Sequence, residues 1–250
     1  MSESRECVFC GALPVTRENI FAEWMQVAFK EIIGDAGVVE IRRDDGTSIT
    51  FPSAPFTHTV RRFCEDCNAK WMGGMETRVQ PFLTPMMTGG FPNSLTPAMQ
   101  LLLANWAVKT ALVLNYMRPN KRPIPDSKYP AFRASSTPLA RQLVWIGHRD
   151  PRKDNLIVKS YIGKTPDPGA TNRTNQGWPY LCTFSIGFVV LQVFGHTMPL
   201  TLNIELGDDH PRVMSMIFPV QGRIEWPPTS INTVGDIALL HQLFTGAPLP

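Results

Sequence analysis

The chain has 250 residues, 43% of them hydrophobic, and its 24 basic and 21 acidic residues leave a formal net charge of +3. This composition indicates a globular protein of one large or two modest domains, and so weak a charge permits nucleic-acid binding without indicating it. Uninterrupted apolar runs of about 18 residues and a basic-then-apolar leader are both missing. We therefore expect a cytoplasmic protein with no membrane partner.

Two Cys-x-x-Cys pairs mark the first part of the chain, at Cys7 and Cys10 and again at Cys64 and Cys67. Each pair can present two thiolates from one tight knuckle, and four soft ligands suit a tetrahedral structural Zn²⁺. Two disulfides or four unrelated thiols are the alternatives, although disulfides of this spacing are usually redox-active and need an oxidising compartment. The sequence therefore predicts a zinc site on these four cysteines.

A helical pattern follows the first pair, from an N-cap at Thr16 to Ile33, and Gly34 ends it. Glu18 falls in the expected first turn. Thr16 and Glu18 can serve the helix end alone, as cap and as dipole partner. Beside a zinc site, the same polar turn indicates the rim of an active site.

The next elements lead into the second cysteine pair. Strands are expected at 38–43 and 47–51, on either side of an Asp-Asp-Gly turn, and at 57–63. A helix is expected from Asn68 to about residue 79. Glu76 lies about two turns beyond Asn68 and on roughly the same side of that helix, either as a salt-bridging residue or as a metal carboxylate.

The remainder predicts a Pro/Gly-rich connection at 81–97, a nearly all-apolar helix from Pro97 to Met117, and a basic linker at 118–138. The last part is β-rich, with a polar loop at 165–179 and a short helix at 234–244. Its strands are expected at 143–147, 156–162, 180–194, 200–206 and 213–220.

These elements predict an α+β fold in three parts. An N-terminal zinc-binding domain covers 1–90, a central core helix 91–118, and a β-rich C-terminal domain 119–250. The basic pairs at 42–43 and 61–62, with Lys70 and Arg78 on the helix that follows, can contact phosphates or form a solvated sheet face.

Three stretches together resemble one known family: Cys7-Val-Phe-Cys-Gly11, Thr16-Arg-Glu-Asn-Ile20 and Cys64-Glu-Asp-Cys-Asn-Ala-Lys-Trp-Met72. With them the chain resembles the zinc-knuckle HNH endonucleases, and more narrowly the HNH-like proteins of bacteria and phages. The resemblance implies a ββα-metal element in which an acidic ligand, here Glu18, and a helix residue, here Asn68, hold a catalytic Mg²⁺ or Mn²⁺. Zinc on the cysteines is then structural.

The position of the family's general base is occupied by Asn19, where the family has His. A carboxamide cannot accept a proton from water near neutral pH, although it can orient a water molecule. An inactive natural relative, an inactivating substitution and the use of another base remain open. His58, before the strand that leads to Cys64, is the candidate substitute base. The alternative is that His58 has no catalytic role and is a surface residue or one hydrogen-bonded to a partner within the fold.

Two functions follow from these residues. The first is an HNH-type endonuclease that hydrolyses phosphodiesters, with DNA more expected than RNA as its substrate. It is inactive as given if no other group replaces the base that Asn19 cannot supply. The second is a catalytically dead zinc protein that binds nucleotide, nucleic acid or a protein partner, in phage defence or counter-defence. A homo-oligomer is compatible with either function.

Overall fold

The computed structural model describes residues 6–33, 38–42, 48–52, 58–90, 94–117, 122–135, 137–139, 141–151, 158–164, 180–196 and 210–227. The predicted loop at 165–179, strand at 200–206 and helix at 234–244 lie outside the described residues. Within the described residues the chain is a mixture of helices and strands, compatible with an α+β fold.

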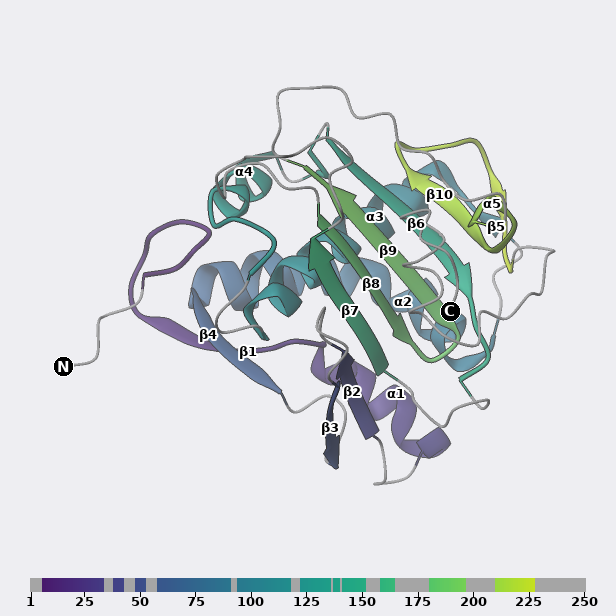
Figure 1. Ribbon diagram of the computed structural model, residues 1–250, viewed down its shortest axis with the longest axis horizontal. Coiled ribbons are helices and arrows are strands. Elements are labelled where there is room, and N and C mark those ends of the chain that lie inside the picture. Colours follow the sequence, from purple (N-terminus) through teal and green to yellow (C-terminus); the bar gives the residue numbers. More distant parts are fainter. Residues whose placement is uncertain are drawn as a thin grey trace.

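Among the described residues, a seven-stranded sheet forms the body of the molecule, in the order β10-β6-β9-β8-β7-β2-β3 (Figure 1). Neighbouring strands are antiparallel except β2 and β7, which are parallel. The sheet therefore contains strands from both the first and the last of the expected domains. Its strands are β2 (Val38–Arg42), β3 (Ser48–Pro52), β6 (Gln142–His148), β7 (Val158–Lys164), β8 (Tyr180–Ile186), β9 (Val189–Gly195) and β10 (Met214–Phe218).

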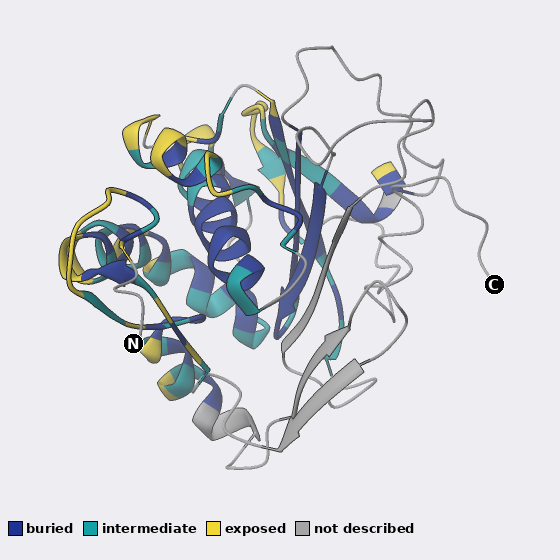
Figure 2. Cartoon of the chain, turned by 60° about the vertical axis from the view of Figure 1, so that its left-hand side comes forward, coloured by how far each residue is buried: buried dark blue, intermediate teal, exposed yellow. Residues whose placement is uncertain are grey.

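The long helices α2 and α3 lie on one side of this sheet (Figure 2). Helix α3 (Pro97–Leu114) packs against the sheet, where the rings of Trp106 and Phe184 are 6.0 Å apart, and α2 (Gly73–Thr88) packs against α3. Helix α3 begins as predicted, because the Thr96 hydroxyl accepts a hydrogen bond from the backbone nitrogen of Met99 at 3.3 Å. Because the sheet covers one side of α3 and α2 covers another, the nearly all-apolar surface of α3 is buried.

By length and composition alone, the stretch Pro97–Met117 could cross a membrane. Its most apolar window is 67% buried inside the protein, and the core helix of a folded domain passes the same test. The structure thus agrees with the prediction of a central core helix.

Helix α2 corrects the prediction of a Pro/Gly-rich connection after residue 80. A π-helical turn, η1 (Asp66–Met72), leads into α2, which continues through Pro81 and Pro85 to Thr88. Proline inside a helix removes a hydrogen bond and costs about 3 kcal/mol. The apolar face of α2 offsets this cost, because Met75, Val79, Leu83, Met86 and Met87 are all buried. Gly89, with φ of 93°, then ends the helix.

The expected basic linker also contains structure. Helix α4 (Lys128–Ser135) lies within it, after the single turn η2 (Asn115–Met117). The buried Asn115 side chain fixes this region, since its Nδ2 donates to the Ile124 carbonyl at 2.8 Å and its Oδ1 accepts from the Ile124 nitrogen at 3.2 Å. The remaining short elements are β5 (Ser94–Leu95), α5 (His210–Val213) and β11 (Ile224–Glu225).

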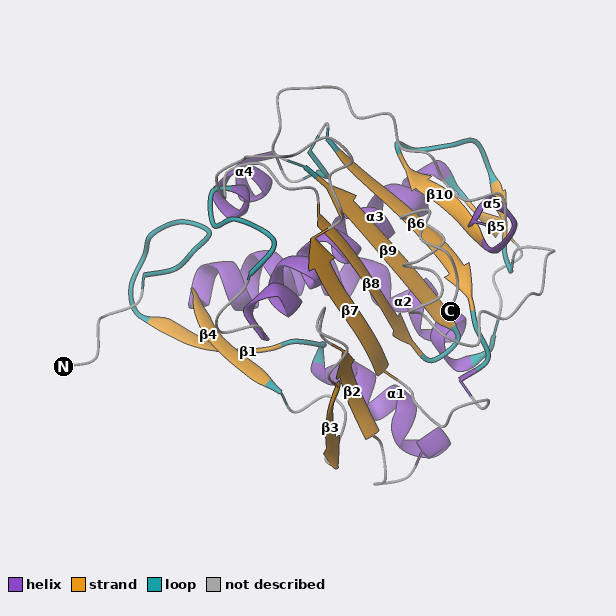
Figure 3. Cartoon of the chain, in the orientation of Figure 1, coloured by secondary structure: helices purple, strands orange, loops and turns teal. Residues whose placement is uncertain are grey.

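The prediction of a helix starting at Thr16 is wrong. Residues Val15–Asn19 form strand β1, which pairs antiparallel with β4 (Thr59–Cys64), and helix α1 (Glu23–Ile33) begins only afterwards (Figure 3). Val15 and Thr16 are β-branched and favour a strand, and β4 supplies the partner that the local sequence does not reveal. The β1–β4 ribbon and the helix that follows it place the cysteines and the predicted site residues together.

Candidate functional site

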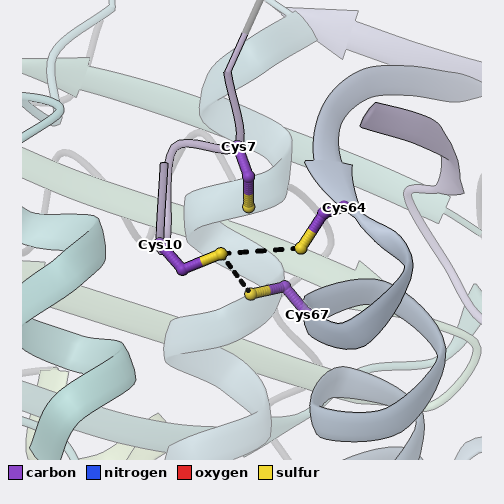
Figure 4. A group of neighbouring side chains, drawn as sticks. All are labelled: Cys7, Cys10, Cys64 and Cys67. Atoms are coloured by element: carbon purple, nitrogen blue, oxygen red, sulfur yellow. Dashed lines mark hydrogen bonds between the residues drawn. The ribbon is translucent and has the colours of Figure 1, made fainter. Parts of the chain in front are cut away.

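The four cysteines of the two pairs come together at the base of the β1–β4 ribbon (Figure 4). All their Sγ atoms lie within 4.8 Å of one another, and Cys10 Sγ lies 3.5 Å from Cys64 Sγ and 3.6 Å from Cys67 Sγ. Zn–S bonds of about 2.3 Å in a tetrahedron place the sulfurs about 3.8 Å apart. All four are free thiols. The cluster could therefore hold a metal ion such as Zn²⁺.

The first knuckle is shaped by its own backbone. The nitrogen of Gly11 donates to the carbonyl of Cys7 at 2.7 Å, and the nitrogen of Cys7 donates to the carbonyl of Ala12 at 3.0 Å. Gly11 has φ of 77°, a left-handed conformation that favours glycine. The nitrogen of Val8 donates to the carbonyl of Arg62 at 3.0 Å, which holds the knuckle against β4.

The thiols of this cluster differ in their pKa values. Burial raises the pKa of Cys10, and burial together with the neighbouring sulfurs of Cys10 and Cys7 raises that of Cys67 well above its ordinary value. Burial acts the same way on Cys7, but hydrogen bonds from backbone groups outweigh it and lower the pKa. A bound cation would offset the cost of ionising all four thiols.

Asn68 ties the helical segment to strand β1. Its Nδ2 donates to Thr16 Oγ1 and to the carbonyl of Arg17, both at 3.0 Å, and the Thr16 hydroxyl donates to the carbonyl of Phe63 at 3.1 Å. The amide nitrogen of Asn68 thus serves the fold, and Oδ1 is the atom that could face an ion. Asn68 adjoins Cys67 in sequence, so it also links the cysteine cluster to β1.

Glu18 and Asn19 lie on opposite faces of the ribbon. Glu18 pairs with Val60 and is 7% exposed, whereas Asn19 pairs with Thr59 on the more accessible face. The Nδ2 of Asn19 donates to Glu23 Oε1 at 3.1 Å, and this bond is exposed to solvent. The two adjacent residues that the family resemblance assigns to one site therefore have different surroundings.

His58 extends the inward face on which Glu18 lies. The nitrogen of Ile20 donates to the carbonyl of His58 at 3.0 Å, which continues the pairing of Glu18 with Val60 by two residues. His58 and Glu18 are thus diagonal neighbours, a relation that spans about 7–8 Å in antiparallel strands. Burial lowers the pKa of His58, so its imidazole is neutral at physiological pH.

A buried ion pair lies next to Glu18. Lys109 of α3 is 1% exposed, and its Nζ lies 2.6 Å from Glu76 Oε1 of α2. This confirms the prediction of Glu76 as a salt-bridging residue. Burial raises the pKa of Glu18 to about 7; the positive charge of Lys109 opposes that shift, and the negative charges of Glu76 and Glu23 add to it.

The described residues offer fewer oxygen ligands for a second metal ion, a divalent one, than the four sulfur ligands of the cysteine cluster. In the described parts of the chain, the four cysteines are the single group of three or more His, Cys, Asp or Glu side chains close enough to share an ion. Mg²⁺ is usually bound through one or two carboxylates together with substrate phosphates and water. Glu18 can supply one such carboxylate, so the fit to a divalent ion is partial.

The basic residues expected to contact phosphates fall into different settings. Arg62 is partly buried, with its guanidinium 3.8 Å from the carboxylate of Asp126 and stacked over the ring of Tyr116. Lys70 pairs with Asp66 at 2.5 Å. Arg61 is exposed on the outer side of the ribbon, and the described structure shows no ion pair for it. The side chains at 42–43 lie outside the description.

Sequence reasoning missed two charged residues near the site, Lys109 and Arg133. Lys109 interrupts an otherwise apolar helix, and a lone lysine at such a position signals a buried partner. Arg133 lies in the expected linker, where no local pattern connects it to the cysteines.

Comparison of the chain with protein-family models, with curated proteins and with solved structures finds no match. The function therefore rests on the geometry of this site and on the sequence motifs.

Proposed function

We propose that the protein hydrolyses phosphodiester bonds of nucleic acid, DNA in the first place, with a divalent ion at Glu18. The observation that carries this proposal is the register of the β1–β4 ribbon, which puts Glu18 and His58 on the same inward face. Asn68, bonded to the backbone beside Glu18, fixes the helical segment against this face. These features support an HNH-type ββα element, with zinc on the cysteines as its structural base.

The residues of the face have distinct roles in this proposal. A divalent ion bound there would stabilise the charge that develops on the phosphate and the leaving oxygen. Glu18 would hold that ion, and Mg²⁺ or Mn²⁺ is expected because the ligand is oxygen. His58, neutral at physiological pH, can accept the proton of the attacking water.

Asn19 contributes little to this chemistry. Its amide faces the outer side of the ribbon and bonds Glu23. A carboxamide has no basic nitrogen at neutral pH, so the base has to be another group. The structure thus favours His58 over a site organised around Asn19.

The test compares the zinc-loaded protein with its Glu18→Gln variant. Binding of Mn²⁺ is measured from the decrease of the paramagnetic resonance signal of the free ion. Cleavage is measured from the nicking of supercoiled plasmid. Glu18→Gln is expected to lose both Mn²⁺ binding and nicking. Glu225→Gln, an exposed carboxylate on β11, is the matched control and is expected to keep both. Wild-type Mn²⁺ binding and nicking in Glu18→Gln would overturn the proposal.

A second candidate is a zinc-stabilised protein that binds nucleic acid or another partner without hydrolysis. The 7% exposure of Glu18 and the engagement of Asn19 with Glu23 favour it, because both limit what a substrate can reach. Retention of a labelled oligonucleotide without any cleaved product, at saturating Mn²⁺, would support this candidate.

A further inference from the structure

Helix α4 reaches back to the cysteine cluster from the segment after the core helix. The Phe132 ring lies 5.6 Å from the ring of Trp71, which follows the second cysteine pair in sequence. The Tyr129 ring lies 5.3 Å from the ring of Phe9, which lies inside the first knuckle. Both knuckles are therefore packed against α4.

Arg133 is the charged residue of α4 that this packing brings to the cysteines. Its guanidinium carbon lies 4.8 Å from the centre of the Trp71 ring, a stacked cation–π geometry. Burial raises the pKa of Cys67, and the nearby guanidinium of Arg133 acts in the opposite direction. The Nε of Arg133 is buried and has no hydrogen-bond partner in the described structure. The guanidinium thus retains an unused donor while stacked on Trp71, four residues after Cys67.

The charge of a loaded cluster explains why a cation belongs there. Four thiolates and one Zn²⁺ carry a net charge of −2, and three of the four cysteines are at most 6% exposed. Buried charge is costly unless it is paired and hydrogen-bonded. Lys70, a cation that follows the second cysteine pair, is 77% exposed and already bonded to Asp66. Arg133 is held in place by stacking, so it loses little freedom in serving this role.

We propose that Arg133 is a positioning residue of the zinc centre, which donates to Cys67 Sγ and offsets part of the negative charge of the loaded cluster. Zinc binding and the docking of α4 are then linked, since each stabilises the other. This inference is independent of nucleic-acid cleavage. It requires only that the cysteines bind zinc.

The test measures zinc affinity of the full-length protein by competition with a chromophoric chelator. Arg133→Gln is expected to bind zinc about 10–100-fold more weakly, the usual effect of removing a partner of a metal ligand. Arg122→Gln is a matched control, because Arg122 also stacks on an aromatic ring, Tyr116, at 4.5 Å but is bonded to Asp126. The control is expected to keep wild-type affinity. Equal affinities for both variants would overturn the proposal.

A conservative variant keeps the test valid if Arg133→Gln does not fold. Arg133→Lys retains the charge and loses the planar donor set, so a partial recovery of zinc affinity is expected. In Co²⁺-loaded protein, the thiolate-to-cobalt charge-transfer band is expected to shift in Arg133→Lys and to stay in place in Arg122→Lys. Identical bands in wild type and Arg133→Lys would show that Arg133 only packs against Trp71, and would overturn the proposal.

Discussion

Replacing Glu18 by glutamine is expected to stabilise the folded protein at pH 8. Burial holds the pKa of Glu18 at about 7 in the folded state, against an ordinary value of 4.5. A difference of one pKa unit corresponds to 1.36 kcal/mol, so ionising Glu18 costs about 3 kcal/mol more in the folded protein than in the unfolded chain. Glutamine has the shape of the protonated carboxyl and carries no charge.

The sign of the pH dependence follows from proton uptake. Between pH 4.5 and 7 the folded state holds a proton that the unfolded chain has released, so the stability of the wild type falls as the pH rises through this window. Above pH 7 the protonated Glu18 carboxyl no longer contributes to the free energy of unfolding, and this part of the pH dependence ends. Glu18→Gln is therefore expected to match the wild type near pH 4.5 and to exceed it by about 3 kcal/mol at pH 8.

Urea unfolding of both proteins at saturating zinc, from pH 5 to pH 8, measures this difference. Protonation of the cysteines and release of zinc at low pH affect both proteins and cancel when the free energies of unfolding are subtracted. Mn²⁺ at pH 8 is expected to stabilise the wild type and not the variant. A difference in unfolding free energy that stays constant over the whole pH range would refute the reasoning.

The other predictions concern the residues around this face. Asn68→Ala removes two hydrogen bonds to β1 and is expected to lower the free energy of unfolding by about 1–3 kcal/mol in urea melts, with no loss if the bonds contribute nothing. Lys109→Met leaves Glu76 buried without its partner and is expected to lower the free energy of unfolding by about 3–5 kcal/mol. The double variant Lys109→Met/Glu76→Leu is expected to regain most of this loss, and additive effects of the two substitutions would contradict a coupled pair. Arg61→Gln is expected to weaken oligonucleotide binding and to reduce its salt slope by about 0.9, whereas Lys70→Gln, whose lysine is paired with Asp66, changes the slope less. Equal slopes for the two variants would exclude Arg61 as a phosphate contact.

The sequence predicted those parts of the fold that depend on local pattern. The cysteine spacing anticipated the cluster, and the Thr96-Pro97 cap anticipated the start of the core helix. The hairpin strands at 38–42 and 48–52 agree with alternation around a turn. Each of these signals lies within a few residues of the element that it predicts.

The errors arose where distant partners decide the local structure. Thr16 is a good helix cap by local sequence, but residues 15–19 form a strand because β4, forty or more positions away, supplies its hydrogen bonds. Pro81 and Pro85 read as helix breakers, but the buried apolar face of α2 keeps the helix intact. In both cases long-range contacts outweigh the local preference.

Apart from the cysteine cluster, the roles of the candidate site residues remain predictions, and the structure shows only how these residues are arranged. Glu18, Asn19, Asn68 and His58 all lie on or beside the β1–β4 ribbon, where the sequence had predicted a helix for the first two. Adjacency in sequence could not show that Glu18 and Asn19 lie on opposite faces, since that follows from strand alternation and the sequence predicted a helix there. The buried charge of Lys109 was equally hidden, because its partner lies 33 positions earlier.

The most direct test of the account is the Mn²⁺-dependent nicking of plasmid by wild type, His58→Ala and Asn19→His. With His58 as the base, the wild type nicks plasmid, Asn19→His adds nothing, and His58→Ala loses about 10²–10⁴-fold in rate. Nicking by Asn19→His alone would contradict the account, because it would place the base at residue 19 and the wild-type site would be inactive.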